Sequence, residues 1–223
     1  CVLELGCGVG MVGLVSTKAS SHKLWVSTDG DESALEMCRK NFLLNESPSR
    51  NVWVRKLQWG NEEQTSQLLD DLKFFSEETT SPFDSIVAAD IVYPDTCGPV
   101  LQALFTTVDR LLKTGGIFWL SFVTRDGART PRQLIESASD AGFRIQALPQ
   151  LDAETKSKLP PLLDARILFL TREAEAREKN AKLGCDDCSV FPGLRAAMAR
   201  LDDPSSEEEW EAPYGGDESS DEE

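Results

Sequence analysis

The stretch "VLELGCGVGMVGL", residues 2–14, joins a short apolar run to a rapid succession of glycines. The apolar run predicts a buried strand, and the glycines predict a sharp turn that leads into a helix. Two ligand-binding patterns overlap in this turn. Gly8, Gly10 and Gly13 fit the GxGxxG loop of dinucleotide-binding proteins, whereas Glu4, Gly6, Gly8 and Gly10 fit an E-x-G-x-G-x-G loop.

The acidic residue ahead of the glycines favours the second pattern, which resembles the loop of S-adenosylmethionine-dependent methyltransferases. A carboxylate at Glu4 suits the cationic amino group of a methionine and would be unfavourable beside a pyrophosphate. A nicotinamide-dependent oxidoreductase remains the alternative, because both patterns use the same backbone geometry.

Beyond this turn, strand-like and helix-like segments alternate along the chain. Such alternation is typical of a mostly parallel sheet with helices on both faces. We therefore expect an α/β fold with a doubly wound, Rossmann-like sheet of seven strands. The expected strands are 1–5, 24–29, 52–59, 83–90, 117–123, 144–149 and 165–172, and the expected helices are 11–20, 31–45, 62–75, 98–116 and 130–143, the last two ended by glycines.

Composition divides the chain into three parts. The 223 residues carry a net charge of −15, and residues 202–223 hold eleven acidic residues and no basic one. The rest of the chain therefore carries only −4, so a nucleic-acid partner is not expected. We expect one folded domain at 1–171, a partly helical extension at 172–201 and an acidic disordered tail at 202–223. The tail is interpreted as a solvated segment, with an arm that contacts a basic partner as the alternative.

The six cysteines are irregularly spaced, which argues against a disulfide framework and for an intracellular location. Cys185 and Cys188 form one CxxC pair. A structural zinc site usually needs four ligands, and the chain has a single histidine, His22, and no second CxxC. We expect no metal site, with a metal or redox role of the pair as the alternative. No apolar run approaches the roughly 20 residues that span a bilayer, so no membrane partner is expected.

Two side chains at predicted strand ends could bind a nucleoside. Asp29 ends the second strand, where an acid can accept hydrogen bonds from ribose hydroxyls; it could also cap the helix that follows. Trp59 ends the third strand, where an indole can stack on an adenine or border its pocket. Burial of the indole in the core is the alternative.

The segment "IVAADIVYPDTCG", residues 86–98, places an acid and a phenol at the end of the fourth strand. Asp90 follows the apolar run, Tyr93 comes three residues later, and Pro94 ends the strand pairing. This exit lies near the expected topological switch point, where open α/β sheets bind their ligands. Asp90 and Tyr93 are therefore candidate site residues, and a buried strand end with Asp90 as a helix cap is the alternative.

Together these features resemble the seven-β-strand protein-lysine methyltransferases that carry an Asp-x-x-Tyr motif after the fourth strand. That group includes enzymes that modify translation elongation factors and chaperones. Residues 2–14 match its first motif, "LQWGN" matches its Leu-x-Trp-Gly segment, and "AADIVY" matches its hallmark. "TD", Thr28 and Asp29, matches the end of its second strand, and "FWLSFVTRDG" with a later "AGF" resembles the elongation-factor-2 subgroup.

The resemblance implies a methyltransferase domain at 1–171 that uses S-adenosyl-L-methionine and a protein substrate presenting a lysine. It implies catalytic roles for Asp90, which would orient the amine, and Tyr93, which would offer a ring wall and a hydroxyl. It also implies a cytoplasmic enzyme, with the nucleus as a second location. The implied cofactor site consists of Glu4, Gly6, Cys7, Gly8, Gly10, Asp29, Trp59 and Ala89.

One departure from the family concerns the beginning of the chain. The family has a segment ahead of the first strand, often with a further cofactor-contacting tryptophan, and this sequence starts at Cys1. We therefore expect a missing N-terminal segment. A methyltransferase acting on a small molecule or nucleic acid, and a non-catalytic protein that keeps the fold, remain as alternatives.

Overall fold

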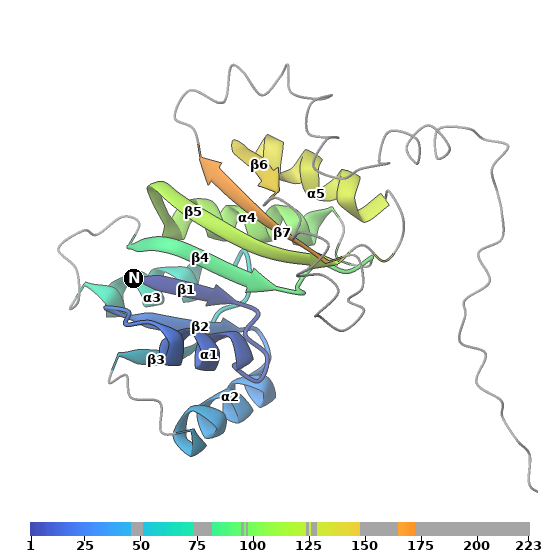
Figure 1. The fold of residues 1–223 in the computed structure, drawn as a ribbon. Helices are drawn as coiled ribbons and strands as arrows, with labels where there is room; N and C mark the ends of the chain where they lie inside the picture. Colours follow the sequence, from blue (N-terminus) through green and yellow to red (C-terminus); the bar gives the residue numbers. More distant parts are fainter. Residues whose placement is uncertain are drawn as a thin grey trace, which may run out of the picture.

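The computed structural model of the 223-residue chain describes residues 1–45, 51–73, 82–94, 96, 98–123, 125, 129–147 and 165–172. In this part strands and helices alternate as expected (Figure 1). The extension beyond residue 172, the acidic tail and the Cys185/Cys188 pair lie outside the described residues. The strands are β1 (Val2–Leu5), β2 (Trp25–Asp29), β3 (Val52–Lys56), β4 (Phe83–Ala89), β5 (Leu112–Val123), β6 (Phe143–Ala147) and β7 (Ala165–Arg172); the helices are α1 (Met11–Ala19), α2 (Glu32–Leu44), α3 (Glu62–Leu72), α4 (Pro99–Leu111) and α5 (Arg129–Asp140).

The strands form one seven-stranded sheet in the order β3-β2-β1-β4-β5-β7-β6. The pairs from β3 to β5 are parallel, and β7 runs antiparallel to both β5 and β6. The chain order therefore reverses between β1 and β4, whose carboxyl ends lie side by side because Leu5 pairs with Ala88. This is the switch point at which such sheets bind ligands. The predicted mostly parallel, doubly wound fold is confirmed.

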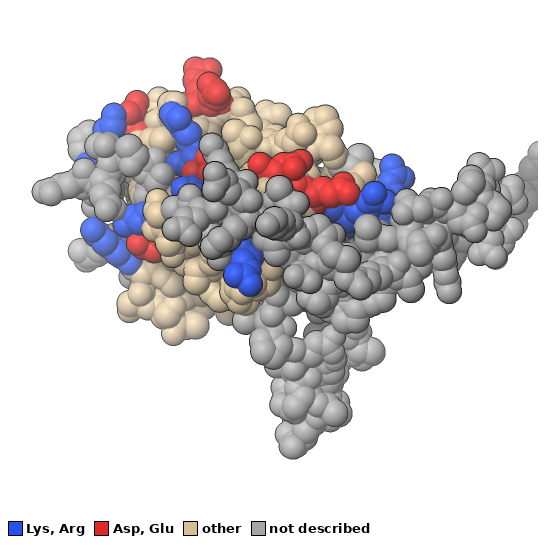
Figure 2. All heavy atoms as spheres, turned by 90° about the horizontal axis from the view of Figure 1, so that it is seen from above, with Lys and Arg blue, Asp and Glu red and all other residues tan. Residues whose placement is uncertain are grey.

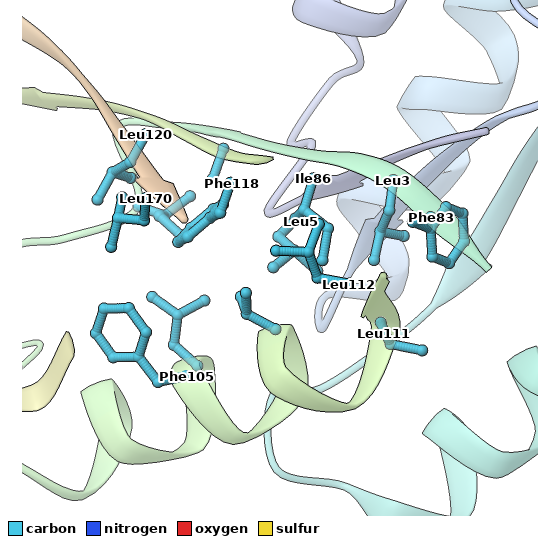
Figure 3. Packing of buried hydrophobic residues seen from close by; sticks show 14 of the residues in the cluster. Leu3, Leu5, Phe83, Ile86, Phe105, Leu111, Leu112, Phe118, Leu120 and Leu170 are labelled. Atoms are coloured by element: carbon cyan, nitrogen blue, oxygen red, sulfur yellow. The ribbon is translucent and has the colours of Figure 1, made fainter. Parts of the chain in front are cut away.

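Helices cover the sheet from two sides and build two apolar clusters. The larger cluster packs Leu3 and Leu5 of β1, together with residues of β4, β5 and β7, against α3, α4 and α5. Figure 3 shows strand side chains such as Leu5 and Phe118 directed toward Phe105 of α4. The smaller cluster joins Cys7 to residues of α1 and α2. Because successive residues of a strand point to opposite faces, Glu4 points away from the larger cluster, toward α1.

Two predicted element boundaries are wrong. The third strand ends at Lys56, so Trp59 lies in the β3–α3 turn, in which Gly60 adopts a φ of 76°. The helix expected at 98–116 ends at Leu111, because Leu112 is extended (φ −82°, ψ 131°) and pairs with Phe83 of β4. The glycines at 115 and 116 therefore lie within β5 and end no helix. No turn residue separates Leu111 from Leu112, so the sequence pattern placed the end of the helix at the glycines that follow.

Two surface observations concern partners. Among the described residues, no helix is both long enough and apolar enough to cross a membrane. On the face seen in Figure 2, the described Lys and Arg side chains lie in separate places with acidic side chains among them. This face therefore carries mixed charge without a continuous basic stripe.

Candidate active site

The glycine loop joins β1 to α1 at the switch point. Gly6, Gly8 and Gly10 all adopt positive φ, at 64°, 51° and 86°. The Cys7 N–H donates to the Thr28 carbonyl at 2.9 Å, and the Gly10 N–H donates to the Cys7 carbonyl at 2.8 Å. A Cβ atom on Gly8 would meet nothing within 4 Å, whereas one on Gly10 would lie 2.6 Å from the Cys38 sulfur. The loop is thus packed on α2 at Gly10 and open at Gly8, as a ligand cradle requires.

Asp29 ties the end of β2 to this loop. Its Oδ2 accepts a hydrogen bond from the Gly8 N–H at 2.9 Å, and its Oδ1 accepts one from the Asp31 N–H at 3.0 Å. The alternative role of Asp29 as a helix cap is wrong, because Asp31 caps α2 by accepting from the Ser33 N–H. Each Asp29 oxygen keeps a lone pair for a further donor, so a ribose hydroxyl is compatible with these contacts.

Glu4 differs most from its predicted placement. The side chain is only 2% exposed, and its Oε2 accepts from the Ser27 hydroxyl at 2.6 Å and from the Trp25 indole N–H at 3.2 Å. Burial raises the pKa of the Glu4 carboxyl, although both hydrogen bonds oppose this shift. A Cβ on Gly13 would lie 2.9 Å from Oε2, so the carboxylate sits beneath α1. The geometry favours a role in supporting the loop over direct contact with a methionine amino group.

Cys7 contributes its backbone to the loop, while its thiol points into the α1–α2 cluster. The Cys7 and Cys38 sulfurs lie 3.9 Å apart, and Cys7 is buried. The hydrogen bond with Cys38 and burial raise the pKa of the Cys7 thiol, so it stays protonated. Cys7 therefore contributes to the loop through its main-chain hydrogen bonds to Thr28 and Gly10.

Trp59 lies close to the loop although it is not part of β3. A Cβ on Gly6 would come within 3.8 Å of Cζ2 of its indole, which is half-buried. The turn that carries the indole is held from two sides. The Leu57 N–H donates to the Asp29 carbonyl at 2.9 Å, and the Gly60 N–H donates to the Thr107 hydroxyl of α4 at 2.8 Å. The indole therefore borders the Gly6 side of the loop.

The exit of β4 holds the two predicted catalytic residues. Ala89 is the last residue of β4 and pairs with Ser121. Asp90 follows with a φ of 55°, the only positive value at a described non-glycine residue. Its N–H still donates to the Ser121 carbonyl at 3.0 Å, while its half-exposed carboxylate turns outward. Such strained backbone conformations concentrate at functional sites.

The residues after Asp90 anchor this exit. Ile91 and Val92 return to the core, and a Cβ on Gly6 would lie 2.6 Å from Cγ2 of Ile91. Tyr93 and Thr96 form a turn in which the Tyr93 N–H donates to the Thr96 hydroxyl and the Thr96 N–H donates to the Tyr93 carbonyl. The Tyr93 side chain is 46% exposed. Packing of Ile91 on Gly6 thus brings the Asp90–Tyr93 segment beside the glycine loop.

Sequence reasoning missed Arg125. Its Nη2 donates to Asp90 Oδ1 at 2.7 Å and to Oδ2 at 2.9 Å, and its guanidinium carbon lies 5.2 Å from the centroid of the Tyr93 ring. A signal existed, because Arg125 follows β5, the parallel neighbour of β4, and carboxyl ends of parallel strands share one edge. Ile91 was also missed, since a buried residue after a strand carries no distinct pattern.

The geometry brings most predicted residues together at one edge of the sheet. Gly6, Gly8 and Gly10 form the loop, Asp29 and Trp59 flank it, and Ala89, Asp90 and Tyr93 follow from β4. Glu4 and the Cys7 thiol face the opposite layer. In the described part of the chain, no group of three or more His, Cys, Asp or Glu residues could hold a metal ion.

Several solved structures that share this fold are methyltransferases. A precorrin-6y C5,15-methyltransferase from Geobacter metallireducens gives a TM-score of 0.54 at 20% identity, covering 77% of this chain and 79% of that chain. The glycopeptide N-methyltransferase MtfA, in complex with sinefungin, gives a TM-score of 0.57 at 14% identity, covering 77% and 86%. The sheet order and the glycine loop thus define the class as a Rossmann-like methyltransferase fold.

Comparison with protein families and curated proteins assigns the chain more narrowly than its fold does. The chain belongs to the lysine methyltransferase family, whose model matches residues 1–132. The protein-lysine N-methyltransferase EEF2KMT of Mus musculus is 31% identical over 162 residues, which is 66% of this chain and 44% of that protein. The chain therefore spans less than half the length of this curated relative. The resemblance drawn from the sequence is confirmed at the level of the family.

Proposed function

We propose that the protein is an S-adenosyl-L-methionine-dependent protein-lysine N-methyltransferase. Membership of the lysine methyltransferase family supports this proposal, and so does the similarity to the mouse protein-lysine N-methyltransferase EEF2KMT. The observation that carries it is the position of Asp90 and Tyr93 beside the glycine loop, held there by the packing of Ile91 on Gly6. A cation-binding pair next to a nucleoside cradle suits transfer to an amine.

In this proposal the cofactor lies along the open side of the loop. The backbone of Gly6, Gly8 and Gly10 approaches it closely, Asp29 accepts from its ribose, and Trp59 borders its adenine. The small side chain of Ala89 leaves room for the cofactor at the end of β4. Glu4 and Cys7 act from beneath, by fixing the loop. The bound group supplies a methyl on a cationic sulfur, which an amine can displace in line.

The residues of the chain then prepare the amine. A free lysine has a pKa near 10.4, so under about a thousandth of it is neutral at pH 7. Desolvation at the edge of the sheet and the nearby positive sulfur would lower that pKa. Asp90 orients the incoming nitrogen and passes its proton toward solvent, while the Tyr93 ring and hydroxyl fix its direction. The main contribution is alignment at near-attack distance.

The substrate and its location are part of the proposal. We infer a protein substrate that presents a lysine, of the translation elongation factor or chaperone type that the sequence resemblance implies. A cytoplasmic or nuclear site of action follows from that substrate class. The catalytic domain is proposed to span 1–171.

The test is transfer of labelled methyl groups from S-adenosyl-L-methionine to proteins of a heat-treated cell extract. We expect a labelled band that resists nuclease, with methyl-lysine located by mass spectrometry. Label in the nucleic-acid or small-molecule fraction would contradict the proposal. Calorimetry with S-adenosyl-L-methionine and with a nicotinamide dinucleotide separates the methyltransferase from an oxidoreductase.

A further inference from the structure

The Asp90–Tyr93 site already holds a cation from the chain itself. Arg125 Nη2 contacts both oxygens of Asp90, at 2.7 and 2.9 Å, and the guanidinium lies 5.2 Å from the Tyr93 ring centroid. These are an ionic contact and a cation–π contact, the same two that the proposed function assigns to a lysine ammonium. A lysine ammonium that takes the same position, between the two Asp90 oxygens and over the same face of the Tyr93 ring, must displace the guanidinium.

The contact between Arg125 and Asp90 has the features of a weak ion pair. Both carboxylate oxygens are reached by the same nitrogen, so the pair lacks the two-nitrogen fork of the strongest arginine–carboxylate contacts. The side chains are 31% and 50% exposed, for Arg125 and Asp90 respectively. Exposed pairs of this kind contribute little stability, because water competes for both charges. The guanidinium can therefore be replaced at small cost.

We propose that Arg125 is a placeholder for the substrate cation, which the incoming lysine displaces from Asp90 and Tyr93. This inference rests on the proposed function for the identity of the substrate amine. Arg125 holds the Asp90 carboxylate in place and satisfies its charge in the free protein. An incoming cation must therefore bind Asp90 and Tyr93 more tightly than the guanidinium does, which favours a cation that reaches both groups. Arg125 is thus a specificity-determining residue that leaves the site before transfer.

If Arg125 is a placeholder, its removal should change KM for the lysine substrate and leave kcat unchanged. Arg125→Gln removes the competing cation and keeps a polar side chain, so KM for the lysine substrate should fall roughly fivefold, the equivalent of about 1 kcal/mol. The value of kcat should stay unchanged, since the guanidinium is absent from the transition state. Arg125→Lys keeps a competing cation and should stay near the wild type. Arg132→Gln, which removes an exposed pair with Glu136 on α5, is the matched control.

A binding measurement tests the inference without methyl transfer. The chain has two tyrosines, so ring-labelled tyrosine gives two sets of NMR signals, and Tyr93→Phe assigns them. Titration with n-butylammonium should shift the Tyr93 signals in the wild type. The Arg125→Gln variant should bind the probe about fivefold more tightly. The double variant Asp90→Asn with Arg125→Gln should lose this gain, because the carboxylate that attracts the probe is gone.

The outcomes separate this inference from the proposed function. Equal probe affinity in the wild type and Arg125→Gln, or a fall in kcat with KM unchanged, would overturn the placeholder and indicate a positioning role for Arg125. Absence of methyl transfer to any protein, together with the expected gain in probe affinity, would refute the proposed function and leave the cation site standing.

Discussion

Asp90 combines a strained backbone with an outward-facing carboxylate. Its φ of 55° turns the chain so that Ile91 and Val92 return to the core while the carboxylate stays at the edge of the sheet. A positive φ costs a non-glycine residue about 1–2 kcal/mol, and asparagine and aspartate tolerate it best. Asparagine at this position therefore removes the charge and leaves the backbone largely undisturbed.

We expect Asp90→Asn to reduce kcat/KM for the protein substrate by at least about 100-fold, the usual lower bound for loss of a general acid–base group. Asp90→Ala should abolish transfer altogether. Cofactor affinity, measured by calorimetry, should stay close to that of the wild type, because Asp90 faces the amine. Asp84→Asn, an exposed acid at the other end of β4, is the control. Full methyl transfer by Asp90→Asn would exclude the proposed role.

The buried carboxyl of Glu4, beneath α1, makes the free energy of unfolding depend on pH. Burial raises the pKa of its carboxyl above the ordinary value of 4.5. Below pH 4.5 the group is protonated in both the folded and the unfolded chain; above the raised pKa the folded chain must hold a buried charge. The contribution of Glu4 to the free energy of unfolding is therefore fully present at low pH and is lost as pH rises through that interval.

Glu4→Gln keeps an acceptor for the Ser27 hydroxyl and removes the charge. Its free energy of unfolding, relative to the wild type, should increase between pH 4 and pH 7, as measured by urea unfolding at several pH values. Glu136→Gln, at an exposed position on α5, should show no such trend. A difference between Glu4→Gln and the wild type that stays constant with pH would mean that the pKa of Glu4 is the same in the folded and the unfolded chain, against the raised pKa expected from burial.

At the scale of elements, two glycines of the loop between β1 and α1 have different surroundings: Gly10 packs against α2, and Gly8 faces open space. Both Gly8→Ala and Gly10→Ala place a side chain at positive φ, which costs about 1 kcal/mol or more. Alanine at position 10 also meets the Cys38 sulfur, for a total of about 2–4 kcal/mol. Alanine at position 8 meets no protein atom but extends into the proposed cofactor site.

We therefore expect Gly8→Ala to lose about 1 kcal/mol of stability and more than tenfold in S-adenosyl-L-methionine affinity. Gly10→Ala should lose affinity and far more stability. Urea unfolding and calorimetry on the same samples give both quantities. Wild-type cofactor affinity in Gly8→Ala would show that the ligand lies elsewhere.

The sequence predicted elements better than contacts between them. The spacing of apolar residues and the positions of turn residues located all the strands and helices of the described part, because each element has its own apolar pattern. The boundary at Leu111–Leu112 was missed because no turn residue separates the two leucines, and the glycines at 115 and 116 suggested a later helix end. The orientation of Glu4 was predictable in principle. Leu3 and Leu5 face α4, so strand alternation directs Glu4 to the opposite side, against Ser27 of β2.

Unlike the orientation of Glu4, the contact between Arg125 and Asp90 does not follow from the pattern of a single strand. It joins the ends of β4 and β5, which lie 35 residues apart in the chain and meet only through the parallel pairing of those strands. A motif search reads "DIVY" and "VTRDG" as separate segments. The position of Arg125 after a predicted strand indicates only that it lies at the same edge of the sheet as Asp90. The contact itself depends on β4 and β5 being neighbours, which neither segment shows alone.

At the scale of the molecule, the negative charge is concentrated at the C-terminal end of the chain. Residues 202–223 supply eleven acidic residues, and their removal changes the net charge from −15 to −4. A segment so rich in like charges and so poor in apolar residues has little surface to bury against the domain. We therefore expect truncation after Leu201 to leave the free energy of unfolding, cofactor affinity and KM for a protein substrate unchanged.

Salt dependence decides between this solvating role and a docking arm for a basic partner. Attraction over the length of such a segment is strong at 0.01 M salt, where the Debye length is about 30 Å, and is largely screened at 1 M, where it is about 3 Å. A docking arm would therefore raise KM on truncation at low salt only. A variant of equal length, with the eleven acids replaced by Asn and Gln, separates charge from length. A KM that rises in both variants at low salt and recovers at high salt would contradict the solvating role and assign the acidic residues to substrate capture.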